Sequence, residues 1–261
     1  MTAADADRLD AEPVRRSTLG REVWIVLGLS LGQSAVYAAL SLVRKLTQGS
    51  LRDSTATLNG NLADQAWLDL TLQLVGIGFA LVPVALAWYL LSLDRSTSSV
   101  ARRLGMDRGR PVRDLAAGAA LAAVIGLPGL GLYAVGRALG ITAEVVTAPD
   151  VTHWWTVPVL VLAAFQNALL EEVVVVGYLM TRLRQQSWSL AATIATSALL
   201  RGSYHLYQGI GPAIGNAVMG VVFGYWFHRR GRVLPLVVAH TLLDVVAFVG
   251  YLYLAGPLGL R

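Results

Sequence analysis

The chain has 261 residues, of which 55% are hydrophobic and 14% are charged. About a quarter of the residues in soluble domains are charged, so this composition excludes an ordinary soluble protein and indicates an all-α, polytopic transmembrane helix bundle. The net charge of +5 does not indicate nucleic-acid binding, because the arginines are spread over short loops, and the lack of cysteine excludes disulfides, thiol nucleophiles and cysteine–zinc sites.

Apolar windows predict about seven membrane-spanning helices. A polar N-terminal tail, residues 1–21, comes first and lacks the apolar core of a cleaved signal. Residues 22–150 are expected to form the N-terminal transmembrane helices, and residues 151–255 a core that carries the polar residues described below. The windows lie at about 22–43, 68–93, 114–136, 154–181, 188–207, 212–228 and 233–255.

The distribution of basic residues predicts the orientation. Fifteen of the 21 lysine and arginine residues fall in the tail and in alternate loops, and Arg44 and Lys45 are among those on the other side. Positive charge gathers on the cytoplasmic side, so the N-terminus is predicted inside and the C-terminus outside. We therefore expect a multi-pass protein of the cell membrane, in contact with the lipid bilayer and with no nucleic-acid partner.

Two adjacent glutamates, Glu171 and Glu172, lie inside the apolar stretch from Val157 to Met180. One carboxylate at bilayer depth costs about 2.5–3.5 kcal/mol on insertion scales, so a pair needs a reason. The structural explanation is that one is protonated and the other is paired. The functional explanation is a site inside the membrane, and the rest of the chain supplies partners for it.

Four more polar residues lie where hydropathy alone would not place them. His205 ends the fifth window and shares a helix face with Arg201, while His240 and Asp244 are four apart and share a face of the seventh. A lone buried histidine is more often a satisfied core residue than a catalyst. Together with the two glutamates, however, these residues on three helices would form a hydrated polar pocket.

The order and spacing of these residues resemble the CPBP family (CAAX protease and bacteriocin-processing enzymes, also called Abi), which are intramembrane proteases. That family shows Glu-Glu-x-x-x-Arg, then Phe-x-x-x-His, then His-x-x-x-Asn or Asp. The resemblance covers roughly residues 154–250. The matching segments here are Glu171-Glu172-x-x-x-Val176, Arg201-x-x-x-His205 and His240-x-x-x-Asp244.

Two family positions are changed in a reciprocal way. The arginine expected at position 176 is Val176, and the phenylalanine expected at position 201 is Arg201. Our hypothesis is that the guanidinium reaches the glutamates from the fifth helix and keeps a buried counter-charge for them. Glu172, paired with Arg201, would then be a supporting charge. The alternative is a degenerate site.

The resemblance implies catalytic roles for four residues. Glu171 would be the general base that activates water, and His205 would position or polarise that water. His240 and Asp244 would lie on the side of the developing oxyanion. An ionised aspartate cannot donate a hydrogen bond, so Asp244 would have to be protonated or orient His240.

The cofactor is open at this point. Glu171, His205 and His240 could ligate zinc with an open fourth position. The same layout fits a metal-free mechanism, and the zinc motif His-Glu-x-x-His is missing from the sequence. The choice therefore lies between no cofactor and a divalent metal such as zinc.

The leading function is an intramembrane endopeptidase that hydrolyses a membrane-associated or lipidated peptide or protein tail. One competing function is a catalytically altered membrane scaffold or bacteriocin-immunity protein, which the changes at Val176 and Arg201 favour. Another is a proton-coupled transporter, since glutamate and histidine relays occur in pumps. The odd number of predicted spans and the lack of a visible internal repeat speak against the transporter.

Overall fold

The computed structural model describes residues 16–94, 96–147, 153–250 and 253. Residues 1–15 of the predicted polar tail therefore lie outside the described part, and residues 16–21 open the first described helix. The N-terminal half comprises α2 (Arg16–Gly28), α3 (Leu31–Gln48), η1 (Leu51–Asp53), β1 (Thr55–Leu58), α4 (Ala66–Ala80), α5 (Val82–Ser92), α6 (Val100–Arg103), α7 (Pro111–Ala138) and β2 (Glu144–Thr147).

The second half is entirely helical where the structure describes it. It comprises α8 (Thr156–Glu171), the π-helix η2 (Glu172–Tyr178), α9 (Leu179–Gln185), α10 (Leu190–Tyr204), the 3-10 turn η3 (Leu206–Gln208), α11 (Ile210–Arg230), α12 (Leu234–Val245) and the π-helix η4 (Val246–Gly250). Each of the seven apolar windows corresponds to one helix or one run of adjoining helices, so the predicted helical bundle is confirmed.

The described part of the chain has fewer helices that meet the length and hydropathy of a membrane span than the sequence has apolar windows. Among the described residues, four helices are long and apolar enough to cross a membrane: Ala66–Ser92, Pro111–Ala138, Thr156–Gln185 and Ile210–Arg230. A fifth results if α2 and α3, which are bent by 52° at their junction, count as one span. α10 and the described α12–η4 segment are shorter than these helices, and the predicted number of seven spans stays a prediction. The predicted side of the N-terminus stays a prediction.

The bend between α2 and α3 has a local cause. The Ser30 hydroxyl donates a hydrogen bond to the Val26 carbonyl at 2.6 Å, and such bonds compete with the helix ladder and often bend helices. A side chain at Gly32 would meet the Leu27 carbonyl oxygen at 2.7 Å, so only glycine lets the chain pass this closely after the bend.

The span that carries the two glutamates lies at the centre of the bundle. In its most apolar window 67% of the residues are buried inside the protein, whereas the corresponding share is 17% in Ala66–Ser92 and 6% in Pro111–Ala138. Those two spans expose large apolar side chains, such as Phe79 and Leu127, as helices that face lipid do. The span that carries the two glutamates is therefore much more buried than these two outer spans.

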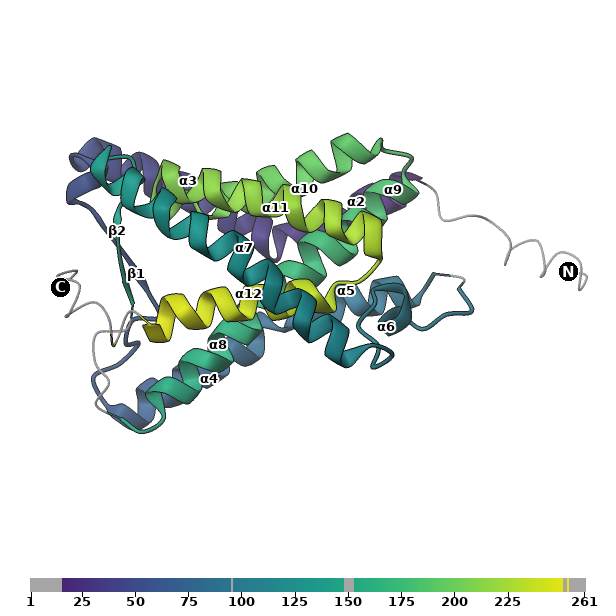
Figure 1. The fold of residues 1–261 in the computed structure, drawn as a ribbon, viewed down its shortest axis with the longest axis horizontal. Coiled ribbons are helices and arrows are strands. Elements are labelled where there is room, and N and C mark those ends of the chain that lie inside the picture. The colour runs from purple at the N-terminus through teal and green to yellow at the C-terminus, as the bar shows by residue number, and fades with distance from the viewer. Residues whose placement is uncertain (1–15, 95, 148–152, 251–252, 254–261) are drawn as a thin grey trace, which may run out of the picture.

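Figure 1 shows α3, α10 and α11 along one side of the molecule and α4 and α8 diverging from them on the other, with α7 and α12 between. α10 packs along α11, and α12 packs along α7 and α8. α10 and α11 approach closely at Gly220, where a side chain would lie 2.8 Å from the Ala198 Cα. This glycine of α11 thus allows the two helices to approach closely.

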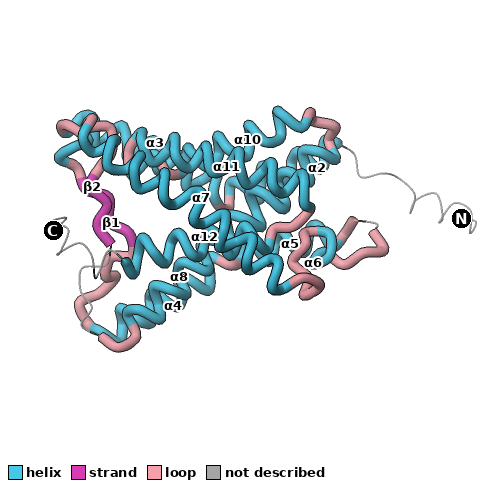
Figure 2. Tube along the Cα trace, in the orientation of Figure 1, coloured by secondary structure: helices cyan, strands magenta, loops and turns pink. Residues whose placement is uncertain are grey.

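Two short strands, β1 and β2, lie side by side between the α3 side and the α4–α8 side of the molecule (Figure 2). β1 and β2 pair in parallel, with Thr55 opposite Glu144 and Leu58 opposite Thr147. They come from the connections before α4 and before α8, so the pairing joins two loops that are far apart in sequence. Residues 46–66 were expected to be a polar external loop, and the strand within it was not predicted.

Candidate active site

The candidate site lies where three helices meet at the central span. Glu171 is the last residue of α8 and Glu172 the first residue of η2, while Arg201 comes from α10 and His240 from α12. All four side chains are buried. A π-helix in place of regular α-helix is often found at functional sites, and here it begins at the glutamate pair.

Arg201 joins the two carboxylates. Its Nη1 donates to Glu171 Oε2 at 3.3 Å and its Nη2 donates to Glu172 Oε1 at 2.7 Å, so the ion pair predicted from the reciprocal change is present. The guanidinium carbon also lies 5.4 Å from the centre of the Phe223 ring. Val176 is fully buried in the apolar cluster that contains Phe223. Position 176 therefore belongs, as an apolar residue, to the cluster whose Phe223 ring the guanidinium contacts.

His240 stands between two carboxylates. Its Nδ1 is 2.7 Å from Glu172 Oε1, and its Nε2 is 3.6 Å from Asp244 Oδ1, one helical turn further along α12. The same Nδ1 lies 4.0 Å from Glu171 Oε2. His240 faces the bundle interior and not lipid, as the catalytic hypothesis requires.

His205 lies at the end of α10, in the tight turn before η3. Its ring meets the Tyr204 ring edge-on, with the ring centres 5.0 Å apart, and its buried Nδ1 has no hydrogen-bond partner. The fifth window forms a short helix, α10, of 15 residues, or about 22 Å. It then turns back into α11.

The His205 turn is fixed from outside by the N-terminal half of the chain. The buried Lys45 ammonium donates to the Tyr207 carbonyl at 2.6 Å, and the Ala143 amide donates to the Gln208 carbonyl at 2.9 Å. Thr142 and Gly209 form an isolated antiparallel bridge. A cation at a helix C-terminus also interacts favourably with the helix dipole. Lys45, which stood on the unexpected side in the charge count, is therefore an internal anchor.

Two site residues were missed by sequence reasoning. The Tyr204 hydroxyl donates to Glu171 Oε2 at 2.6 Å, and the Asn167 side chain hydrogen bonds to Asp244. Tyr204 follows Arg201 by three positions and Asn167 precedes Glu171 by four, so each shares a helix face with a recognised residue. That spacing was the available signal, but tyrosine and asparagine are common enough in helices that it did not stand out.

The metal hypothesis was tested on the arrangement of the donor atoms. Among the described residues, one group has ligand atoms that all lie within 4.8 Å of one another, and it consists of Glu171, Glu172 and His240. Glu172 thus takes the place that zinc ligation had assigned to His205. The 2.7 Å contacts from Arg201 Nη2 and His240 Nδ1 both end on Glu172 Oε1. These groups bind one another directly and Arg201 already supplies a positive charge, so the arrangement fits an ion poorly.

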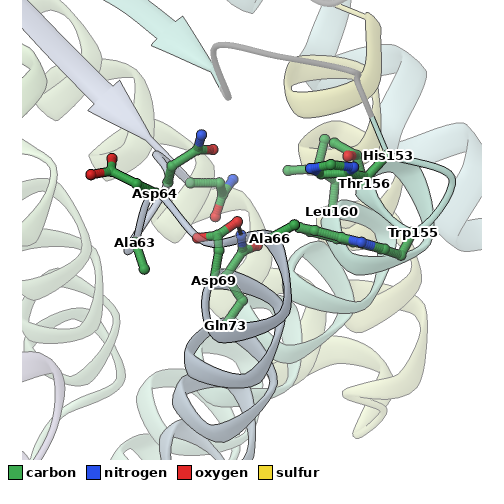
Figure 3. A pocket seen from close by; sticks show the side chains of 11 residues that line it. Ala63, Asp64, Ala66, Asp69, Gln73, His153, Trp155, Thr156 and Leu160 are labelled. Carbon is green, nitrogen blue, oxygen red and sulfur yellow. Dashed lines mark hydrogen bonds between the residues drawn. The ribbon is translucent and has the colours of Figure 1, made fainter.

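Two cavities elsewhere do not include the candidate residues. A small one of about 40 Å³ lies between the start of α4 and the start of α8, where Asp69, Gln73, His153 and Trp155 line it (Figure 3). A larger one of about 450 Å³ lies among α9, α10 and α11. The chemistry therefore points to the buried cluster and not to either cavity.

The fold and the site together define a helical membrane protein with a buried glutamate–arginine–histidine centre. Residues 153–246 match the family model described as type II CAAX prenyl endopeptidase Rce1-like. This region contains all of the residues on which the resemblance to the CPBP family rests, and the match confirms that resemblance. It supports a CAAX-type intramembrane endopeptidase that is a multi-pass membrane protein. Comparisons with curated proteins and with solved structures found no significant match.

Proposed function

We propose that this protein is an intramembrane endopeptidase in which Glu171 activates the attacking water. The observation that carries the proposal is the difference between the two carboxylates. Glu172 is fully buried, with Oε1 engaged by both Arg201 and His240, whereas 8% of Glu171 is exposed. The greater exposure of Glu171 supports it as the carboxylate that would meet water and a peptide, with Glu172 as its support.

The proposed reaction begins with proton transfer from water to Glu171. The resulting hydroxide adds to the carbonyl carbon of the scissile peptide bond, and the carbonyl oxygen becomes an oxyanion. Glu171 then passes its proton to the leaving nitrogen as the C–N bond breaks, which balances protons and charge. A positioned carboxylate used in this way contributes about 10²–10⁴ to the rate.

Three further residues complete the proposed mechanism. His240 hydrogen bonds through Nδ1 to Glu172, while Asp244 Oδ1 lies 3.6 Å from Nε2, beyond hydrogen-bond distance. In the protonated ring, Nε2 would therefore be the donor left for the oxyanion. His205, at the end of α10, would hold the water, because its Nδ1 has no partner within the described chain. Asp244 would orient His240, which resolves the objection that an ionised aspartate cannot donate.

The proposed substrate is a peptide or protein tail held at the membrane. The enzyme itself is proposed to lie in the cell membrane. Support for this class comes from the buried position of the site in the central span and from the Rce1-like match. A site among spans meets substrates that are themselves membrane-associated, because a soluble peptide would have to leave water to reach it.

The test uses the purified full chain in lipid nanodiscs with a library of prenylated and unprenylated peptides, read by mass spectrometry. We expect cleavage by the wild type and none by Glu171→Gln, which keeps the shape and hydrogen bonding of the side chain but accepts no proton. Chelator should leave the wild-type rate unchanged. Cleavage that chelator stops and zinc alone restores would replace the metal-free mechanism with a metal-dependent one. Turnover by Glu171→Gln would overturn the role of Glu171.

A further inference from the structure

Tyr204 is a buried tyrosine in direct contact with the proposed base. It is the last residue of α10, is 5% exposed, and donates from its hydroxyl to Glu171 Oε2 at 2.6 Å. A hydrogen bond from a neutral donor to a charged acceptor is stronger than one between neutral groups. The Tyr204 hydroxyl is thus held by the Glu171 carboxylate and is not a free polar group of the site.

The two donors on Glu171 meet at a single oxygen. Tyr204 and Arg201 Nη1 both bind Oε2, at 2.6 Å and 3.3 Å. Because the two donors come from neighbouring turns of one rigid helix, they fix the plane of the carboxylate as well as its position. Arg201 also binds Glu172, so its own geometry serves two carboxylates at once. Tyr204 is the donor that the described hydrogen bonds commit to Glu171 alone.

We propose that Tyr204 is a positioning residue, which holds Oε2 of Glu171 so that Oε1 faces the attacking water. The proposal rests on the proposed function, in which Glu171 is the base. Positioning of this kind acts on the chemical step and not on substrate binding, since a misplacement of about 1 Å can cost about 10²-fold in rate. Removal of the hydroxyl should therefore lower kcat and leave KM nearly unchanged.

The chain offers a matched control elsewhere. The Tyr178 hydroxyl donates to Glu22 Oε1 at 2.9 Å, and Glu22 is paired with the buried Arg182. This tyrosine–glutamate–arginine group repeats the chemistry of Tyr204, Glu171 and Arg201 but lacks the histidines. A general effect of losing a buried tyrosine hydroxyl should appear in both Tyr204→Phe and Tyr178→Phe. An effect on catalysis should appear only in Tyr204→Phe.

The experiment measures kcat and KM per folded protein, in nanodiscs, for wild type, Tyr204→Phe and Tyr178→Phe. We expect kcat to fall about 10–100-fold in Tyr204→Phe with KM within about twofold of wild type, and kcat to be unchanged in Tyr178→Phe. A third variant, Tyr204→4-aminophenylalanine, keeps the ring and a donor in the same place and should recover at least part of kcat.

Each result decides one question. Equal kcat values for Tyr204→Phe and Tyr178→Phe, or a rise in KM with kcat intact, would overturn the positioning role while the endopeptidase function stands. A wild type without turnover on any peptide would instead remove the function on which the proposal rests. Failure of the 4-aminophenylalanine variant to recover activity, although it is folded, would show that the hydrogen bond is not what matters.

Discussion

Two buried arginines in this protein hold carboxylates, and they do so in different ways. Arg182 donates to Glu22, Asp94, Gln185 and the Leu90 carbonyl, at 2.6–2.8 Å. Its cluster ties α9 to α2 and to the end of α5. None of its side-chain atoms is among the buried groups that lack a partner in the described chain.

The Arg201 cluster leaves several groups unsatisfied. Arg201 Nε, Glu172 Oε2 and His205 Nδ1 are buried and have no hydrogen-bond partner within the described residues. Unsatisfied buried polar groups cost about 1–3 kcal/mol each and are rare in structures that serve stability alone. The Arg182 cluster is thus internally satisfied, as expected of a stabilising cluster, whereas the Arg201 cluster retains unpaired polar atoms, as the proposed catalytic role requires.

The largest expected effect is a loss of turnover when a histidine of the Arg201 cluster is removed. His205→Ala and His240→Ala should each lower turnover by about 10²–10⁴ while the protein accumulates and folds, because each removes a group proposed to act on water or the oxyanion. Initial rates per folded protein in nanodiscs measure this. His153→Ala is the control, since His153 lines the small cavity at the start of α8, and it should keep the wild-type rate.

A second prediction concerns the reciprocal change. Arg201→Phe removes the charge shared by two buried carboxylates and should cost about 3–5 kcal/mol of stability along with activity. Arg201→Phe combined with Val176→Arg should recover some of both, because the guanidinium then reaches the glutamates from η2. Membrane accumulation and cleavage measured side by side test it. If the double variant recovers neither accumulation nor cleavage, Arg201 does not replace the family arginine.

The third prediction treats the other cluster in the same way. Arg182→Met should cost about 1–3 kcal/mol, because Glu22 loses its bound arginine while Asp94 keeps Arg103. The folded fraction should nevertheless turn over substrate at the wild-type rate. Thermal unfolding and rate per folded protein, compared with Arg201→Phe, measure this. A specific loss of rate in Arg182→Met would erase the distinction between the clusters.

The smallest expected effect is a pH dependence of the Arg182 cluster. Burial raises the pKa of Asp94, but hydrogen bonds from Arg103, Arg182 and Gln185 lower it further, so the net pKa lies below its ordinary 3.8. The folded state then gains stability above about pH 4, and loses it as the pH falls through the lowered pKa. For this partly exposed group the gain should be about 0.5–1 kcal/mol. Unfolding midpoints of wild type should therefore fall more steeply in acid than those of Asp94→Asn.

The sequence predicted the helices well and the bundle's interior less well. Hydropathy and length locate apolar helices because the membrane demands both. They do not show which helices are too short to cross the membrane. Only the structure shows that α10 is a short helix that turns back and packs against α11. The β1–β2 pairing was missed because each strand has four residues in a polar loop.

The site was predictable where charge had to enter an apolar helix. Glu171 and Glu172 stood out because burying carboxylates is costly, and the ion pair to Arg201 was predicted from the reciprocal change against the family pattern. Arg182 was among the basic residues assigned to the loops that set the topology, but it is 1% exposed within the bundle. Its burial could not be predicted, because its partners Glu22 and Asp94 are distant in sequence. Tyr204 was missed for the opposite reason, since a tyrosine in a helix carries no cost that calls for explanation.

The most direct test of the account compares two glutamates in matched surroundings. Cleavage rates per folded protein are measured in nanodiscs for wild type, Glu171→Gln and Glu22→Gln, since each glutamate binds one buried arginine and one tyrosine hydroxyl. The account predicts that Glu171→Gln is folded and inactive, while Glu22→Gln is less stable and fully active. Equal activity of the two variants, or inactivity of Glu22→Gln alone, would contradict it.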